Sequence, residues 1–432
     1  MGKIQILQIS DIHWLSIPDA IDDYSLMRRE FLEDIESFCK NGNGNFDHLL
    51  ICGDIAFSGE KDQYTKAQTY IENICTKIKL KKSEVYVVPG NHDKQRNAGK
   101  PALRNLIQSG LACESANDKM FYDLMKGDIE TFRDLFVPFK EYRDFSAGYD
   151  SVEMMMDKCI ERKEIDADND HTYWETIISD NLDGYQVHLY GFNTSLSCDQ
   201  YDWDDWETKR NGHKMFLPKF AYNGFHKKKG KHIYISMMHH PTKYLANGSK
   251  IEEEFDKFFQ LQFYGHVHIS NAFQNADKST VRVFSGAMQP PGALDKKDCQ
   301  YCPVFNIVEL SINKNMDGRD FLHMNLRVNR WNDATKKFED DKKASKEFDI
   351  EINANPSRWE NAPAPVLPKL PDGVTIRDIR VKFVSRLDTK RIINSVYHGF
   401  FDETQTSHTN NVNFLKKINE DNKWIELWNK MK

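Results

Sequence analysis

The segment Val85-Tyr86-Val87-Val88-Pro89-Gly90-Asn91-His92-Asp93 decides the fold of this chain. Its first four residues predict a short buried strand, and the proline and glycine end that strand just before an amide, an imidazole and a carboxylate. The strand predicted over Lys3–Ile9 is likewise followed by Asp11-Ile12-His13, and the strand over Asp47–Cys52 by Gly53-Asp54. Because ligands of open α/β sheets bind at the carboxyl ends of the strands, these side chains are expected to lie close together.

The segments between these strands carry a helical pattern. Apolar residues recur at a spacing of three to four over Ile21–Lys40, and a second helix is predicted over Asp62–Ile78. Alternation of strand and helix favours an α/β fold in which helices cover a parallel sheet. Each polar motif then follows a strand, where it is available to a ligand.

Two further motifs follow later apolar runs. His239-His240-Pro241 comes after the strand predicted over His232–Met238, and Gly265-His266-Val267-His268 comes after the strand over Gln262–Tyr264. Mixed nitrogen and oxygen donors suit Mn, Fe, Zn, Co or Ni better than Ca or Mg. Each motif alone is common by chance, but five in this order predict two adjacent divalent cations, an arrangement that hydrolyses phosphate esters.

The type of each side chain suggests its place in such a centre. An anionic oxygen is needed to bridge two cations, and Asp54 is the natural choice. Asp11 and His13 are two residues apart at the end of a strand, which allows both to reach one ion. Asn91 offers a neutral amide oxygen that keeps the net charge of the site low.

The motif series Asp-x-His, Gly-Asp, Gly-Asn-His-Asp, His and Gly-His-x-His resembles the calcineurin-like metallophosphoesterase superfamily over about residues 3–310. The resemblance implies a four-layer α/β/β/α sandwich and two metal sites. The first site would use Asp11, His13, Asp54 and His268. The second site would use Asp54, Asn91, His239 and His266. His240 is placed beside the ligands, because the single histidine of the family usually stands two places before a proline or asparagine.

The resemblance also implies a mechanism, with manganese as the favoured metal. A hydroxide shared by the two ions would attack the phosphorus atom in line with the leaving oxygen. His92 is the candidate to stabilise the transition state or to protonate the leaving group. Asp93 would orient His92, and the alternative is that Asp93 only caps its loop.

The second motif favours one branch of the superfamily. It reads Gly53-Asp54-Ile-Ala-Phe-Ser-Gly59-Glu-Lys-Asp-Gln-Tyr64, which looks like class III cyclic nucleotide phosphodiesterases and related bacterial diesterases. Protein phosphatases of the superfamily place Asp-Arg-Gly after Gly-Asp, and that arginine is absent here. The expected substrate is therefore a phosphodiester in a nucleotide or nucleic acid.

Two alternatives stay open. A DNA or RNA nuclease would use the basic run Lys227–Lys231 to contact phosphates, although a solvated turn before the His232 strand explains that run better. An effector phosphoesterase of a bacterial signalling or defence complex would be recruited through the C-terminal segment, which would then bind a protein partner. A scaffold that has lost its metals would lack a ligand, and none of the expected ligands is missing.

The domain organisation follows from changes in pattern. Residues 1–352 are expected to form the metallophosphoesterase domain, with a mostly helical insertion at 94–184 that is a possible cap. Later strands follow one another with few helices, which predicts a second, more antiparallel sheet. Five prolines make 353–373 a stiff linker, and 374–432 is predicted to be a small helical module that docks on the main domain or on a partner.

Composition excludes some other functions. The net charge of −6 gives no overall attraction to nucleic acid or anionic lipid, and no run of about 18 apolar residues predicts a membrane span. Scattered cysteines and the lack of a signal-peptide pattern predict a reduced, cytoplasmic protein. The lone pair Cys299-Gln-Tyr-Cys302 is a weak indication of a zinc or redox site. A homodimer is possible by family resemblance, but the sequence identifies no interface.

Overall fold

The computed structural model of the chain describes most of its residues, with several gaps. The described residues are 2–15, 22, 24–102, 104–105, 107, 117–166, 170–198, 214–222, 225, 227–289, 302–314, 318–352, 370–371 and 373–432. The proline-rich linker predicted at 353–373 lies almost wholly outside these residues, and so does most of the Cys299–Cys302 pair. No helix in the described ranges is both long and apolar enough to cross a lipid bilayer.

The first sheet begins as the sequence predicts. Its central strands β1 (Lys3–Ile9), β2 (His48–Cys52) and β3 (Val85–Val88) are parallel. All residues of β2 and β3 are buried, which explains why their sequences are almost wholly apolar. The helices α1 (Ser25–Lys40) and α2 (Lys61–Ile78) connect these strands.

Four later strands widen the first sheet. They are β10 (Val304–Lys314), β11 (Asp320–Asn332), β12 (Lys337–Asp340) and β13 (Lys346–Glu351). β10 pairs with β1 in antiparallel register, so that Ile6 lies opposite Val308, and β11 pairs with β10, β12 and β13. The chain therefore returns to its first strand after about three hundred residues to complete this sheet.

The second sheet has the order β4-β5-β6-β7-β9-β8. These strands are β4 (Tyr173–Leu182), β5 (Tyr185–Phe192), β6 (His232–Met238), β7 (Leu261–Tyr264), β8 (Asn271–Gln274) and β9 (Val281–Phe284). The pairs from β5 through β6 and β7 to β9 are parallel, and only the flanking strands β4 and β8 are antiparallel.

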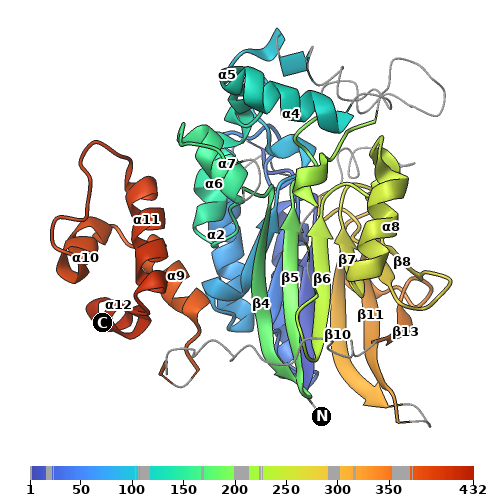
Figure 1. The fold of residues 1–432 in the computed structure, drawn as a ribbon. Helices are drawn as coiled ribbons and strands as arrows, with labels where there is room; N and C mark the ends of the chain where they lie inside the picture. Colours follow the sequence, from blue (N-terminus) through green and yellow to red (C-terminus); the bar gives the residue numbers. More distant parts are fainter. Residues whose placement is uncertain are drawn as a thin grey trace.

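The two sheets pack face to face between helical layers (Figure 1). Apolar residues of both inner faces form one core, which includes Ile6 and Val88 from the first sheet and Leu189 and Ile235 from the second. The outer face of the first sheet packs on α1 and α2, and that of the second packs on α8 (Gly248–Phe258). Each fully buried aliphatic side chain in these cores contributes about 1.5–3 kcal/mol. The chain is thus a four-layer α/β/β/α sandwich.

Two predictions about the sheets need correction. The late antiparallel strands do not form the second sheet but join the first, because β10 pairs with β1. The insertion was expected to run to residue 184, yet β4 occupies Tyr173–Leu182 and pairs with β5. Exposed and half-buried polar residues alternate along β4, and this edge-strand pattern is weak in the sequence.

The insertion itself is helical up to Ile160. It contains α4 (Asn117–Gly127), α5 (Ile129–Asp134), α6 (Lys140–Ala147) and α7 (Met154–Ile160). Figure 1 shows α4 and α5 at the end of the molecule toward which the arrows of β5, β6 and β7 point. This position is consistent with the predicted cap, which stays a prediction.

The C-terminal module is helical, as expected, and has an apolar core of its own. It comprises α9 (Ile376–Val384), α10 (Thr389–Val396), α11 (Ser407–Glu420) and α12 (Trp424–Lys430). Phe383, Ile393, Phe414 and Leu427 are fully buried in that core. The module also contacts the insertion, where His408 Nε2 lies 2.6 Å from Asp157 Oδ1.

One arginine anchors this module to the rest of the chain. The buried guanidinium of Arg377 donates to the backbone carbonyls of Ser83 at 2.6 Å, Val85 at 3.1 Å and Asp150 at 3.2 Å. It also donates to the carbonyl of Tyr149 and covers the ring of Tyr86 at 4.2 Å. α9 is therefore fixed to the start of β3 and to the loop after α6.

We predict that Arg377→Ala loosens this docking. The change leaves buried carbonyl groups unpaired, which is expected to cost about 3 kcal/mol in the free energy of unfolding. Chemical denaturation measures the cost, and hydrogen exchange at the amides of residues 83–86 is expected to accelerate. The matched control is Arg391→Ala, because the exposed Arg391 pairs only with Asp388 of its own module. Equal stability of the two variants would contradict the anchoring role.

Candidate metal centre

The predicted metal ligands all lie in loops at the carboxyl ends of parallel strands. Backbone hydrogen bonds join the loops: Asp11 N donates to Gly53 O at 3.0 Å, His13 N to Asp54 O at 2.9 Å, and Gly265 N to His239 O at 3.0 Å. The loops after β1 and β2 are thus tied to each other, and so are those after β6 and β7. The loops from both sheets that carry the predicted ligands therefore lie close together.

The backbone is strained at most of the ligand positions. Non-glycine residues with positive φ include Asp11 at 53°, His13 at 49° and Asp54 at 52°, together with His266 at 69° and His268 at 55°. This left-handed conformation is uncommon for such residues and costs of order 1–3 kcal/mol each. Strain of this kind concentrates where a functional geometry must be held.

One half of the centre contains Asp11, His13 and His268. His268 Nε2 lies 3.1 Å from Asp11 Oδ1, and His13 Nε2 lies 3.8 Å from the same oxygen. The donor atoms of all three residues fall within 4.8 Å of one another. The other Asp11 oxygen, Oδ2, accepts the backbone N–H of His266 at 3.1 Å. Asp11 therefore ties the loop of the last motif to that of the first.

The other half contains Asn91, His239, His240 and His266. Asn91 Oδ1 lies 3.2 Å from His239 Nε2 and 3.0 Å from His240 Nε2. Since a carbonyl oxygen can only accept, His239 Nδ1 donates to Cys52 O at 2.8 Å, which leaves the Nε2 lone pair for a ligand. Donor atoms of His239, His240 and His266 also fall within 4.8 Å of one another.

Asp54 lies between the two halves. Its Oδ2 atom is 3.3 Å from His239 Nε2 and 3.9 Å from His13 Nε2. Within the described part of the chain, this oxygen and both ring nitrogens of His13 are buried without a hydrogen-bond partner. Unpaired buried acceptors are costly, and a cation satisfies a carboxylate and an imidazole together. The residues present therefore fit two divalent ions that share Asp54.

Charge in the site is balanced by histidines. Burial alone would raise the pKa of Asp11, but the adjacent His268 outweighs it and sets that pKa at about 2. Burial lowers the pKa of His13 to about 4 and that of His266 to about 3, so both rings are neutral near pH 7. Against the effect of burial, the Asp54 carboxylate raises the pKa of His239 to about 9. A metal that binds His239 must displace this proton.

His92 and Asp93 have separate partners. His92 Nδ1 donates to Phe57 O at 2.7 Å, and the His92 ring centre lies 4.7 Å from that of His13. The Asp93 carboxylate accepts the N–H groups of Ala56 at 2.9 Å and Gly90 at 2.8 Å and the hydroxyl of Tyr64 at 2.9 Å.

These partners bear on the role predicted for Asp93, which stays a prediction. The Phe57 carbonyl holds the His92 ring, and the Asp93 carboxylate accepts hydrogen bonds from the loops after β2 and β3 and from α2. Burial, with the charge of Asp54, raises the pKa of Asp93 to about 6. The alternative prediction, that Asp93 caps its loop, describes these contacts better.

The structure adds residues that sequence reasoning missed. His240 was placed outside the ligand set, yet its Nε2 faces the same Asn91 oxygen as His239, while its Nδ1 lies 2.9 Å from Thr194 Oγ1. Phe57 is 39 % exposed beside His92, where it offers an apolar surface next to the ligands. No signal in the sequence marks Phe57, whereas the doubled histidine was a visible reason to consider both rings.

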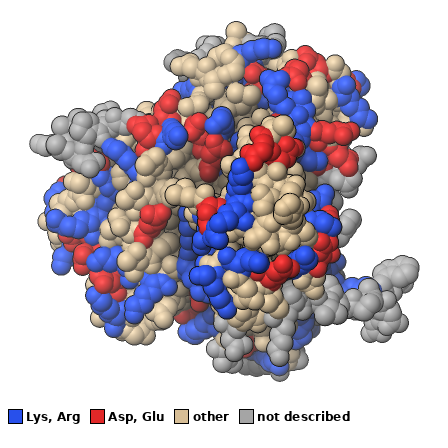
Figure 2. Space-filling model, turned by 90° about the vertical axis from the view of Figure 1, so that its left-hand side faces the viewer, with Lys and Arg blue, Asp and Glu red and all other residues tan. Residues whose placement is uncertain are grey.

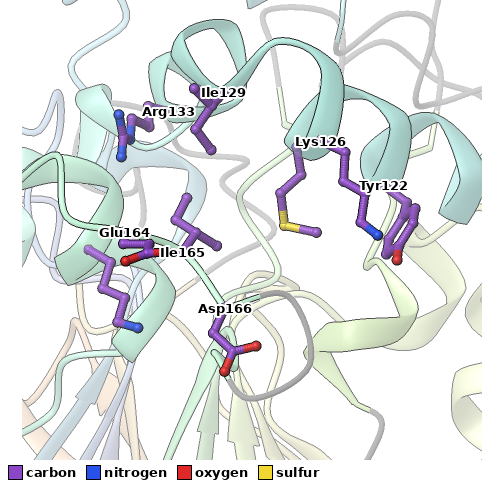
Figure 3. A pocket seen from close by; sticks show the side chains of 9 residues that line it. Tyr122, Lys126, Ile129, Arg133, Glu164, Ile165 and Asp166 are labelled. Carbon is purple, nitrogen blue, oxygen red and sulfur yellow. The ribbon is translucent and has the colours of Figure 1, made fainter.

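A cavity of about 790 Å³ lies outside the centre, in the insertion (Figure 3). Its labelled side chains come from α4, α5 and the segment after α7 and include Tyr122, Lys126 and Asp166. Two of its cations are already paired, since Arg133 contacts Glu130 and Lys158 contacts Asp170. Figure 2 shows acidic and basic side chains interspersed over the face turned to the viewer, as the composition suggested. Neither feature selects a ligand.

A glycine keeps the space that Asp54 occupies. A Cβ atom at Gly90 would lie 2.1 Å from Asp54 Oδ1 and 2.5 Å from Asp54 N. We predict that Gly90→Ala displaces Asp54 and weakens metal binding by about 10–100-fold. Elemental analysis and titration calorimetry with Mn²⁺ measure the loss. The control is Gly127→Ala, where no atom lies within 4 Å of the added carbon, and full metal retention by Gly90→Ala would contradict this geometry.

A buried acid behind the centre gives a pH prediction. Glu153 is 2 % exposed, its carboxyl oxygens lack a well-formed hydrogen bond, and burial raises its pKa well above the ordinary 4.5 despite the nearby Asn193 amide. The folded protein therefore holds a proton that the unfolded chain loses above about pH 4.5, so stability falls as pH rises past that value.

We expect Glu153→Gln to remove this loss of folding stability at higher pH. The variant is expected to gain on the wild type as pH rises from about 5 to 8, by about 1.4 kcal/mol for each unit by which the native pKa is raised. Melting temperatures over that pH range test this, with the exposed Glu164→Gln as control. A stability difference that does not change with pH would contradict the prediction.

Comparison with known proteins agrees with the site. Residues 4–270 match the family model described as calcineurin-like phosphoesterase. An uncharacterised metallophosphoesterase-like protein, YydB of Bacillus subtilis (strain 168), is 25% identical over 295 residues, which are 66% of this chain and 54% of YydB. The matched region thus spans about half the length of that relative.

Solved structures of low similarity were also found. A predicted phosphoesterase from Streptococcus pneumoniae TIGR4 is 12% identical and covers 81% of this chain and 99% of its own, with a TM-score of 0.29. The purple acid phosphatase PPD1 of yellow lupin (Lupinus luteus) is 12% identical and covers 81% and 54%, with a TM-score of 0.36. Likenesses at this level carry no conclusion about the chain. The family match over more than half of its residues does, and the chain belongs to the calcineurin-like phosphoesterase family.

Proposed function

We propose that this protein is a two-metal-dependent phosphodiesterase that acts on a nucleotide or nucleic acid. The observation that carries the proposal is the position of Asp54 Oδ2, which is buried without a hydrogen bond between His13 and His239. One anionic oxygen between two groups of donors is the arrangement that a paired metal site requires. Manganese is the favoured ion among those that suit mixed nitrogen and oxygen ligands.

The ligands divide as the family resemblance implied, with one addition. Asp11, His13, Asp54 and His268 would hold the first ion. Asp54, Asn91, His239 and His266 would hold the second, and His240 is positioned to join them. When bound, the two ions supply positive charge for the phosphate oxygens and lower the pKa of a water molecule.

His92 is the residue proposed to act on the leaving group. Its Nδ1 proton is committed to Phe57 O, so Nε2 is the nitrogen that exchanges a proton with substrate. A protonated ring there would stabilise the charge that develops on the leaving oxygen. The fixed Phe57 contact keeps the ring oriented for this task.

The diester preference rests on the residues around the centre. Ser58 stands where the protein phosphatases have arginine, so no fixed cation at that place clamps a doubly charged monoester. An exposed aromatic ring beside His92 is instead suited to the apolar or aromatic part of a nucleoside. The substrate itself stays a proposal.

The test is hydrolysis of bis(p-nitrophenyl) phosphate by the Mn²⁺-loaded full chain. Activity is expected to need added metal, and Asp54→Asn is expected to lower kcat by about 10²–10³-fold, because the shared anionic oxygen becomes a neutral amide. A panel of cyclic nucleotides, dinucleotides, single-stranded DNA and RNA then identifies the substrate class. A nuclease would show steep dependence on salt concentration.

Tyr122→Phe, a change in the distant insertion, is the control for handling of the variants. His92→Ala in the same assay is expected to retain metal and to slow esters with poor leaving groups more than the p-nitrophenyl ester. A metal-loaded wild type that is inactive on every diester, or an Asp54→Asn variant with full activity, would refute the proposal.

A further inference from the structure

A second pocket lies on the outer face of the second sheet, at the strand β4. It has a volume of about 450 Å³ and is lined mainly by aromatic side chains. The lining residues are Val152, Met154, His171, Tyr173, Trp174, Glu175, Tyr190, Phe225 and Lys228. None of them is among the residues assigned to the metal centre.

The walls of this pocket present flat rings. His171 stacks on Tyr173 with ring centres 4.8 Å apart and planes at 14°. Phe225 meets Tyr173 at 5.5 Å and 60° and meets Tyr190 at 5.8 Å and 74°. Rings in both parallel and edge orientations thus surround a space that is open to solvent. A flat aromatic ligand matches such a surface, because it can stack on one ring and touch the edges of others.

The rim adds a cation, an acceptor and a flexible side chain. Lys228 Nζ lies 3.9 Å from Glu175 Oε1, and both side chains are nearly half exposed. Met154 is 50 % exposed at the start of α7, which the Met155 N–H fixes to His171 O at 3.1 Å. The rim therefore offers hydrogen-bond donors and acceptors beside apolar surface, as the edge of a nucleobase requires.

Positive charge continues beyond the rim. Lys228 belongs to the run Lys227–Lys231, whose lysines are exposed, and Lys231 pairs with Asp320 at 2.9 Å. Lys228 N donates to Tyr234 OH at 2.6 Å, which fixes this run to the second sheet. Exposed lysines next to stacking rings are the combination that single-stranded nucleic acids bind.

The pocket is near the edge of the sheet where the metal ligands emerge. Tyr173 lies opposite Phe192 of β5, and two residues further on Thr194 contacts His240. Two residues of chain span at most about 7 Å. A strand of a few nucleotides seated in the pocket is therefore long enough to reach the metal centre.

We propose that this pocket binds a base of single-stranded nucleic acid or of a nucleotide, stacked against His171 and Tyr173, with Lys228 contacting a phosphate. The binding step stands on the pocket alone. Its consequence, delivery of a phosphodiester to the centre, rests on the proposed function. The pocket then accounts for the basic run, which the metal chemistry leaves without a role.

The experiment is fluorescence anisotropy of a short fluorescein-labelled oligodeoxythymidylate with the full chain, in EDTA so that no hydrolysis occurs. Tyr173→Leu is expected to raise Kd about tenfold or more through loss of stacking. Lys228→Gln is expected to reduce the slope of log Kd against log salt by about 0.7. Met154→Glu changes only an exposed rim residue and is expected to weaken binding without risk to the fold.

The controls are Tyr122→Leu and Lys417→Gln, which change an exposed tyrosine and a paired lysine elsewhere and are expected to bind as the wild type does. Competition with thymidine monophosphate distinguishes a free nucleotide from single-stranded nucleic acid as the source of the base. Displacement of the probe assigns the pocket to nucleotides, and lack of displacement assigns the pocket to single strands. Failure of the wild type to bind the probe, or unchanged binding by all three pocket variants, would overturn the proposal.

The result of this binding experiment is independent of the result of the hydrolysis assay. Each pocket variant is expected to hydrolyse bis(p-nitrophenyl) phosphate at the wild-type rate, since none of the changed residues contacts the metal ligands. If the wild type binds the oligonucleotide but hydrolyses no diester, the proposed function fails and the pocket stands. If the wild type hydrolyses bis(p-nitrophenyl) phosphate but the pocket variants bind the oligonucleotide normally, the proposed function stands and the pocket proposal fails.

Discussion

The Asp54 carboxylate joins the loops of this protein through two different oxygens. Oδ1 accepts the backbone N–H of His92 at 2.8 Å, and Oδ2 faces the rings of His13 and His239 from a fully buried position. Burial of a carboxylate costs several kcal/mol unless opposite charge compensates it. The raised pKa of His239 reflects a proton on this ring, which compensates the buried charge of Asp54. Divalent ions would compensate that charge more fully. The centre is thus built around one anion.

The scaffold supports strain at this centre. Asp11, His13 and Asp54 hold positive φ angles, which the hydrogen bonds between their loops maintain. Asp93 adds to this by gathering N–H groups from two loops, and Gly90 leaves the room that the Asp54 carboxylate needs. Fully buried strands on both sides restrict any relaxation of these loops. The free energy of packing in the sandwich therefore offsets the cost of the strained ligands.

The sequence predicts most of this centre because its parts are local. Each ligand motif follows a strand that is buried on both faces, so mostly apolar runs marked β2, β3, β6 and β7 to within a residue at either end. The pairing of β10 with β1 was not predictable in this way, because strands three hundred residues apart leave no local trace of their register. β4 was missed since edge strands need no continuous apolar pattern.

Side-chain partners were also beyond the sequence. The spacing of His92 and Asp93 invited the idea that one orients the other, yet neighbours in a tight turn point apart, and each found partners in the loop after β2. Likewise, two adjacent histidines suggested one ligand and one bystander, whereas the turn after β6 brings His239 and His240 to the same Asn91 oxygen. Local motifs identify which residues meet, and only the fold decides how they meet.

The insertion and the C-terminal module are connected to the centre through a continuous set of contacts. Phe145 of α6 stacks on Tyr64 at 5.0 Å, and the Tyr64 hydroxyl donates to Asp93. On the other side, Arg143 of the same helix pairs with Asp157 of α7 and with Glu161 just after that helix, and these two carboxylates in turn hold His408 and Thr409 of the module. α6 thus packs toward the metal loops on one face and supports the module on the other. The helical parts are therefore integral to the support of the loops that carry the candidate metal ligands, and substitutions in α6 have to be interpreted with both contacts in view.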